Sequence, residues 1–191
     1  MESSFLALIF RQKYIKRWNL MRSLENEDLQ QHAAETAYIA HMLAVIKNKY
    51  FGGDLNAERV ALLALYHDVP EILTGDLPTP VKYFSPEMRR NYSVIENNAV
   101  EMLLSKLPDE LKDEFSGLLR EEGSEDEKRI VRTADKLSAL IKCVTEEKNG
   151  NKEYKKAREA TEATLKKLSS PELDFFMKTF LPSFEITLDD M

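Results

Sequence analysis

Two imidazoles and two carboxylates stand out in this sequence because they are side chains that bind metal ions: His32, His67, Asp68 and Asp135. His67 and Asp68 end a strongly apolar run, and Asp135 lies at the edge of an apolar helical face. An ionised carboxylate at such a position is costly to bury unless it is paired or bound to a metal. A mixed set of nitrogen and oxygen ligands suits Mn, Co, Ni, Fe or Zn better than Mg. Together, these residues predict a transition-metal site.

Taken singly, each of these residues also has a structural interpretation. His32 is compatible with a satisfied core or helix-terminal histidine, and the pair His67-Asp68 with a helix cap or a salt bridge. Asp135 has two cations on its own helix, Lys136 and Arg132, either of which could neutralise it. Convergence of all four side chains is therefore what separates a metal site from four unrelated structural residues.

The third histidine, His41, is excluded from this site by its spacing. It follows His32 by nine residues, which is about 900° of helical rotation. The two imidazoles would then lie on opposite faces of an intact helix. We expect His41 to be structural or exposed.

Three further residues have side chains that could act on or bind a phosphorylated substrate. Glu71 follows Asp68 by three residues, which on a helix or turn puts both carboxylates on one side, where Glu71 could transfer protons. Arg17 can give two parallel hydrogen bonds to a phosphate. Trp18, the only tryptophan, could form a wall of a binding site. The structural alternatives are a surface carboxylate, a solvated cation and a core aromatic residue.

The elements that must position these side chains are all expected to be helices. Helical periodicity covers nearly the whole chain, and Ser124 to Glu127 form a capping box. Asn56, Ser85-Pro86 and Ser170-Pro171 are further helix starts, and Gly52 ends the helix that carries His32. The sequence predicts one all-α domain over residues 1–191, with a stiff loop at 75–80 and helices at about 4–16, 29–49, 57–66, 71–74, 86–106, 109 onwards, 125–148, 152–168 and 171–180.

Composition narrows the function further. The 191 residues carry a net charge of −6, which argues against broad nucleic-acid binding. The single cysteine, Cys143, excludes an intramolecular disulfide and is expected to be buried. The apolar run at 5–10 is too short to span a bilayer and lacks the features of a signal peptide. We expect a cytoplasmic protein without a membrane partner.

The order His32, His67-Asp68, Asp135 resembles the H…HD…D pattern of the HD superfamily. The segment 67–83, Arg17-Trp18 and two shorter stretches, Phe51-Gly52-Gly53 and Pro182-Ser183-Phe184, are similar to bacterial HD-domain 5′-deoxynucleotidases. This resemblance covers nearly the whole chain. It implies a compact helical HD-domain bundle that forms a homodimer and hydrolyses deoxyribonucleoside 5′-monophosphates with a divalent metal, Co²⁺ or Mn²⁺.

The resemblance also implies roles for individual residues. The metal ligands would be His32, His67, Asp68 and Asp135, and Glu71 and Asp76 would be catalytic. The substrate would be bound by Arg17, Trp18, His32, Asp76, Leu77, Pro78 and Thr79, with Trp18 beside the sugar. This chain departs from the family pattern at Gln31 and Pro70, which flank ligands and bear on metal preference.

Two other functions stay open at this point. Another HD-superfamily hydrolase, acting on a nucleotide phosphodiester or triphosphate, would share the same metal site. A helical binding or scaffold protein with a vestigial site would keep the fold but not the chemistry. The intact ligand set and Glu71 favour an enzyme.

Overall fold

The computed structural model describes residues 2–82 and 84–190, without the side chain of Thr79. This part of the chain is helical, and its only β-type pairing is one isolated antiparallel bridge between Lys16 and Asp28. The all-α prediction is confirmed. No helix in the described ranges has both the length and the apolar character needed to cross a membrane.

The α-helices are α1 (Phe5–Ile9), α2 (Leu29–Tyr50), α3 (Ala57–Tyr66), α4 (Glu71–Thr74), α5 (Thr79–Lys82), α6 (Pro86–Leu104), α7 (Asp109–Leu119), α8 (Glu125–Lys148), α9 (Lys155–Lys167) and α10 (Pro171–Thr179). The 3₁₀ turns are η1 (Phe10–Tyr14), η2 (Lys152–Tyr154), η3 (Leu181–Glu185) and η4 (Leu188–Asp190).

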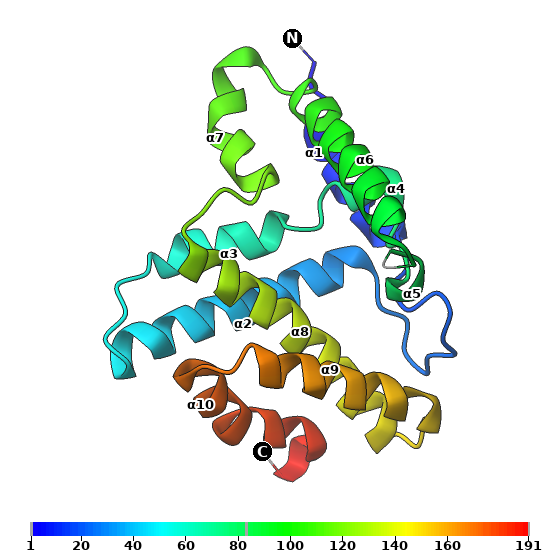
Figure 1. The fold of residues 1–191 in the computed structure, drawn as a ribbon, viewed down its shortest axis with the longest axis vertical. Helices are drawn as coiled ribbons and strands as arrows, with labels where there is room; N and C mark the ends of the chain where they lie inside the picture. Colours follow the sequence, from blue (N-terminus) through cyan, green and yellow to red (C-terminus); the bar gives the residue numbers. More distant parts are fainter. Residues whose placement is uncertain (1, 83, 191) are drawn as a thin grey trace.

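The main hydrophobic core lies where α2, α3 and α8 meet. Figure 1 shows α8 crossing α2 and α3, with α9 and α10 on the side nearer the C-terminus. Leu43, Leu63 and Leu137 contribute one fully buried side chain from each of the three central helices. Burying a leucine side chain stabilises a fold by about 1.5–3 kcal/mol. This core fixes the relative positions of the helices that carry His32, His67 and Asp135.

A second, smaller apolar cluster joins α1, α6 and α7, which lie together at the opposite end of the molecule (Figure 1). Leu103 is its most deeply buried member, followed by Phe5 and Val69. Val69 and Ile72, from the segment after α3, pack into the same cluster. The segment that carries His67, Asp68 and Glu71 is thus anchored at one end by the main core and at the other by this second cluster.

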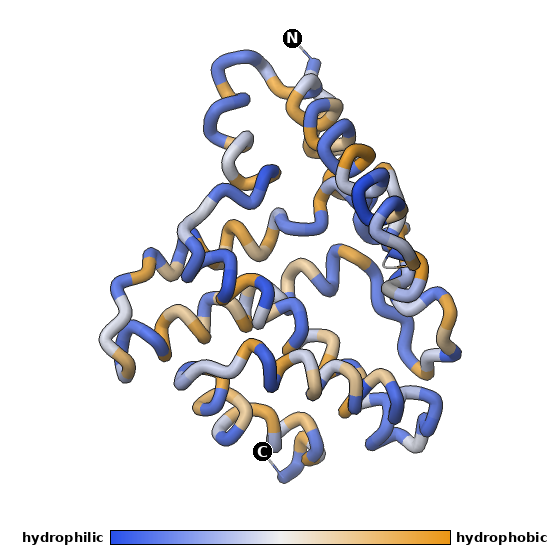
Figure 2. The backbone as a smooth tube through the Cα atoms, viewed as in Figure 1, coloured by the Kyte–Doolittle hydropathy of each residue, from blue (hydrophilic) through white to orange (hydrophobic). Residues whose placement is uncertain are grey.

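The predicted helix starts are confirmed by their capping hydrogen bonds. The side chains of Asn56, Ser85 and Ser170 each accept a backbone N–H from the first helical turn. Ser124 and Glu127 form the full capping box at the start of α8. Figure 2 shows hydrophilic and hydrophobic residues alternating along the helices. This amphipathic pattern is what allowed the helices to be predicted from the sequence.

Three predicted elements were wrong in their extent. The helix expected at 4–16 is α-helical only to Ile9 and continues as the 3₁₀ turn η1 to Tyr14, where it ends because Ile15 is extended and accepts a hydrogen bond from the backbone N–H of Leu29. The helix expected at 152–168 begins as the 3₁₀ turn η2, and its α-helical part starts at Lys155. The loop expected at 75–80 ends at Pro78, and Thr79 begins the short helix α5. Pro80 occupies the first turn of α5, where a helix does not need the backbone N–H that proline lacks.

Candidate active site

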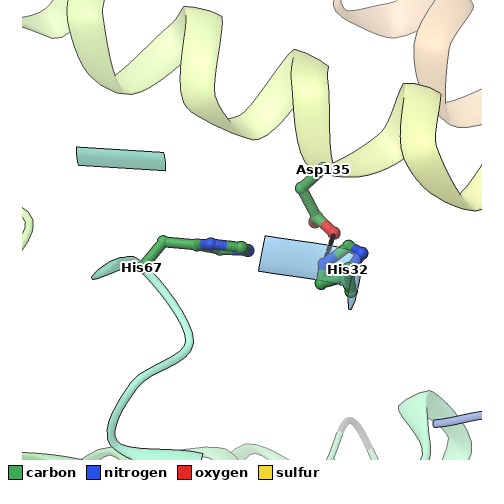
Figure 3. A group of neighbouring side chains, drawn as sticks. All are labelled: His32, His67 and Asp135. Carbon is green, nitrogen blue, oxygen red and sulfur yellow. Dashed lines mark ion pairs between the residues drawn. The ribbon is translucent and has the colours of Figure 1, made fainter. Parts of the chain in front are cut away.

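Three side chains from three helices of the main core point toward one another (Figure 3). His32 comes from the first turn of α2, His67 is the C-cap residue directly after α3, and Asp135 projects from the middle of α8. One potential ligand atom from each lies within 4.8 Å of the other two. The structure therefore brings together the imidazoles of His32 and His67 and the carboxylate of Asp135.

The hydrogen bonds of the two imidazoles leave both Nε2 atoms available. His67 Nδ1 lies 2.7 Å from the carbonyl oxygen of Ala64, so Nδ1 carries the hydrogen that is donated. His32 Nδ1 lies 3.1 Å from Ser138 Oγ and 3.5 Å from Thr36 Oγ1. Both Nε2 atoms are buried, and neither makes a well-aligned hydrogen bond to a described residue. Buried polar atoms are normally satisfied, so this pair of nitrogens fits a metal ion that both would bind.

The two aspartates face these nitrogens. Asp68 Oδ2 lies 3.1 Å from His67 Nε2 and 3.5 Å from His32 Nε2, and Asp135 Oδ1 lies 3.4 Å from His32 Nε2. Asp135 Oδ2 pairs with Lys136 Nζ at 2.9 Å, so the alternative interpretation of this residue holds for one of its two oxygens. Asp68 therefore joins the group through its contacts with both imidazoles, and Asp135 joins it through His32.

The charges at this place are strongly coupled. Burial disfavours the ionised carboxyl of Asp68, yet the imidazoles of His67 and His32 outweigh it and hold the pKa of Asp68 well below its usual value. Burial also lowers the pKa of His67, but Asp68 and Asp135 reverse this and raise it to about 9. A metal ion bound here would therefore displace a proton from the imidazole of His67.

Glu71 and Lys82 line a cleft of about 230 Å³ that opens beside His67 and Asp68. Glu71 is 6% exposed, and its Oε2 is buried with no hydrogen-bond partner among the described residues. Burial, followed by the nearby charges of Asp68 and Asp76, raises the pKa of Glu71 to about 9 against the opposing effect of Lys82. Lys82 Nζ lies 4.0 Å from Glu71 Oε1. Glu71 can therefore hold a proton at neutral pH next to the metal ligands.

Arg17 reaches the site from the segment between η1 and α2, and Trp18 is its neighbour in the chain. Arg17 Nη1 lies 3.7 Å from Asp68 Oδ2 and 3.8 Å from Asp76 Oδ1, so the guanidinium lies between these two carboxylates. Trp18 is half-buried and has φ of 58°, a left-handed backbone conformation that costs a non-glycine residue about 1–2 kcal/mol. Its ring packs against Tyr154 with a centroid separation of 5.2 Å. Strain of this kind is often found at functional sites.

The remaining predicted substrate residues follow α4. Asp76 is partly buried, and burial raises its pKa in spite of the opposing charge of Arg17. Leu77 and Pro78 are half-buried in the connection between α4 and α5. The side chain of Thr79 lies outside the described part of the structure. His41 is exposed on α2, as expected, and takes no part in the site.

Sequence reasoning missed three residues that border this site. Ser138 follows Asp135 by three residues on α8, and this spacing is a signal that could have placed it beside the metal ligands. Glu121 lines the cleft with a left-handed φ of 51°. Glu27 is 4% exposed and binds both Arg17 and Trp18. In the sequence it belongs to a short acidic run before a helix, which gives no indication of burial.

Comparisons with known proteins agree on one family. The family model described as 5′-deoxynucleotidase YfbR-like matches residues 4–184. A 5′-deoxynucleotidase of Vibrio cholerae is 50% identical over 191 residues, which cover 100% of this chain and 98% of the relative.

Solved structures share the fold. An HD-domain phosphohydrolase from Listeria innocua superposes with a TM-score of 0.82 at 22% identity, covering 95% of this chain and 88% of the other. The cyanophage S-2L HD phosphohydrolase DatZ, bound to dA and one catalytic Zn²⁺, gives a TM-score of 0.65 at 16% identity and covers 95% and 96%. With its helical HD-type fold and a family match over nearly its full length, the chain belongs to the YfbR-like 5′-deoxynucleotidases, a family of phosphoric monoester hydrolases.

Proposed function

We propose that this enzyme hydrolyses deoxyribonucleoside 5′-monophosphates to deoxyribonucleosides and phosphate, with one divalent transition metal held by His32, His67, Asp68 and Asp135. The observation that carries the proposal is the pair of buried Nε2 atoms that make no well-aligned hydrogen bond and both face carboxylate oxygens. The full-length relative from Vibrio cholerae is named a 5′-deoxynucleotidase, which supports the substrate class.

The donor set suits a first-row transition metal, since two imidazoles and two carboxylates offer mixed nitrogen and oxygen ligands. We propose Co²⁺ or Mn²⁺. Such an ion supplies Lewis-acid chemistry, because it polarises a phosphoryl oxygen and lowers the pKa of water. Ser138 and the carbonyl of Ala64 orient the two imidazoles through their Nδ1 atoms, so that both Nε2 atoms face the carboxylates.

Glu71 is proposed as the acid/base residue. Hydrolysis of a phosphate monoester needs a proton on the departing 5′-oxygen. In the metal-free site, burial and neighbouring carboxylates raise the pKa of Glu71 to about 9, which favours a protonated Glu71 as the donor. Its position on the cleft next to Asp68 gives a substrate access to it. Lys82 stabilises the carboxylate that remains after the proton has left.

Arg17 and Trp18 are proposed to recognise the phosphate and the sugar. Arg17 lies against Asp68 and Asp76. A phosphate that binds beside these carboxylates can therefore accept hydrogen bonds from the guanidinium N–H groups of Arg17. Trp18 offers an apolar ring that would leave a ribose 2′-hydroxyl unpaired, at a cost of about 1–3 kcal/mol. We propose that Leu77, Pro78 and Thr79 complete the wall of the site beside Asp76.

Two properties beyond catalysis complete the proposal: the enzyme works as a homodimer and in the cytoplasm. The alternative activity on phosphodiesters or triphosphates is less well supported, because the chain belongs to a family of monoesterases.

A phosphatase panel tests the proposal directly. Deoxyribonucleoside and ribonucleoside 5′-monophosphates are assayed in pairs, together with a di- and a triphosphate, in the presence of Co²⁺, Mn²⁺, Mg²⁺ or a chelator. We expect metal-dependent release of phosphate from the deoxyribonucleotides and much weaker release from their ribose partners. Asp68→Ala should lose metal and activity, whereas Glu71→Ala should keep the metal and lose most turnover. Equal rates on both sugars, or faster hydrolysis of the triphosphate, would contradict the assignment.

A further inference from the structure

Glu27 is a buried carboxylate that the proposed chemistry does not use. Its side chain is 3% exposed, at the residue before the N-cap of α2. The backbone holds it opposite Arg17, because the N–H of Arg17 donates to the carbonyl of Glu27 at 3.0 Å and Lys16 forms a bridge with Asp28. A carboxylate this deeply buried must be satisfied by the groups around it.

Each oxygen of Glu27 serves a different residue of the substrate site. Oε1 accepts a hydrogen bond from Arg17 Nε at 2.8 Å, and Oε2 accepts one from Trp18 Nε1 at 3.2 Å. Oε1 also lies 3.8 Å from Nδ1 of His32. One buried group therefore connects the guanidinium, the indole and a proposed metal ligand.

The contacts of Glu27 leave one edge of Arg17 free to face the site and fix the indole N–H of Trp18. Because Arg17 Nε donates its hydrogen bond to Glu27, the Nη1 edge of the guanidinium is directed toward Asp68 and Asp76. Trp18 has a left-handed backbone and is held by three contacts: Glu27, the ring of Tyr154, and a hydrogen bond from the N–H of Met21 to its carbonyl. Among these, only the bond to Glu27 fixes the indole N–H.

We propose that Glu27 is a positioning residue that holds the side chains of Arg17 and Trp18 in fixed positions relative to each other. Phosphate recognition and rejection of the 2′-hydroxyl then depend on the same buried carboxylate. This inference rests on the proposed function for the roles of Arg17 and Trp18. It adds a residue that makes no contact with the substrate itself and acts on selectivity through the two that do.

The isosteric substitution Glu27→Gln separates the two contacts. An amide has one acceptor atom where the carboxylate has two, so one of the two N–H donors must lose its partner. The charge-assisted bond to Arg17 is the stronger, so the amide oxygen stays with Arg17 and the amide NH₂ opposes Trp18 Nε1. We expect the ratio of kcat/KM for a deoxyribonucleotide to that for its ribose partner to fall roughly three- to tenfold, with a smaller change in deoxyribonucleotide turnover.

Trp18 also gives a readout that does not need activity. It is the only tryptophan of the chain, so intrinsic fluorescence reports its surroundings alone. Glu27→Gln should raise acrylamide quenching of this emission. Glu25→Gln, the same change at an exposed residue of the same segment, should leave both quenching and selectivity at wild-type values.

A double-mutant cycle with Trp18→Phe completes the test, with metal content and thermal unfolding measured for every variant. Phenylalanine has no N–H, so Glu27→Gln should cause no further loss of selectivity in that background. A folded, metal-loaded Glu27→Gln enzyme with wild-type selectivity, or losses that add fully in the double variant, would overturn the inference. If the wild-type enzyme hydrolysed both sugars equally, the proposed function would fail instead, and the quenching comparison alone would still decide whether Glu27 holds Trp18.

Discussion

Burial of Glu71 predicts an unusual dependence of stability on pH in the metal-free protein. The folded state raises the pKa of Glu71 to about 9 from an ordinary value of 4.5. Between these values the unfolded chain releases the proton and the folded chain keeps it. The stability that Glu71 provides is thus fully present below about pH 4.5 and is lost as the pH rises toward 9.

The substitution Glu71→Gln isolates this effect, because glutamine is similar in shape and stays neutral at every pH. The difference in unfolding free energy, variant minus wild type, should rise with pH by at most about 1.4 kcal/mol per unit. Over the three units from pH 5 to pH 8 this amounts to at most about 4 kcal/mol. Titrating groups that do not interact with Glu71 are common to both proteins and cancel in the comparison.

The assay is urea unfolding of chelator-treated wild type and Glu71→Gln at several pH values. Glu114→Gln, which makes the same chemical change at an exposed position on α7, serves as the control. Stability curves of wild type and Glu71→Gln that run parallel from pH 5 to pH 8 would refute the reasoning. Glu71 would then be ionised in the folded protein and unsuited to hold a proton for the leaving group.

Three further predictions concern the metal site and the segment beside it. Cobalt at 100 times its dissociation constant should stabilise the wild type by about 2.7 kcal/mol, seen as a higher Tm, and should leave Asp135→Asn nearly unchanged; an equal rise in both would remove Asp135 from the ligand set. Ser138→Ala takes away a hydrogen-bond partner of His32 and should weaken metal affinity by about tenfold in a calorimetric titration, so unchanged affinity would argue against its orienting role. Glu146→Ala leaves the ammonium of Lys142 without its carboxylate and the backbone N–H groups of residues 24 and 25 without their acceptor. The unfolding free energy should fall by about 3 kcal/mol in chemical denaturation. A loss below about 1 kcal/mol would show that this segment is held by other contacts.

Much of the fold could be predicted from local sequence signals. Caps such as the Ser124–Glu127 box and the left-handed glycine Gly52 act within one helical turn, and the structure has both. One error came from a long-range effect. The helical segment at the N-terminus ends at Tyr14 because Ile15 pairs with Leu29, and nothing near Ile15 in the sequence shows this.

The residues of the candidate site also differ in whether the sequence alone could predict them. His32, His67, Asp68 and Asp135 were found because their residue types and order are informative in themselves. Glu27 was not, because its burial depends on a loop that folds back and places it against residues nine and ten positions earlier. Partners such as Glu27 become visible only when the distances between side chains are known.

The account depends on one metal ion bound by four side chains, and anomalous X-ray scattering from crystals soaked in Co²⁺ or Mn²⁺ tests this most directly. We predict a single strong peak about 2.0–2.2 Å from Nε2 of His32, Nε2 of His67 and the carboxylates of Asp68 and Asp135. A peak bound by other residues, or no peak between these four in an enzyme that still hydrolyses deoxyribonucleotides, would contradict the account.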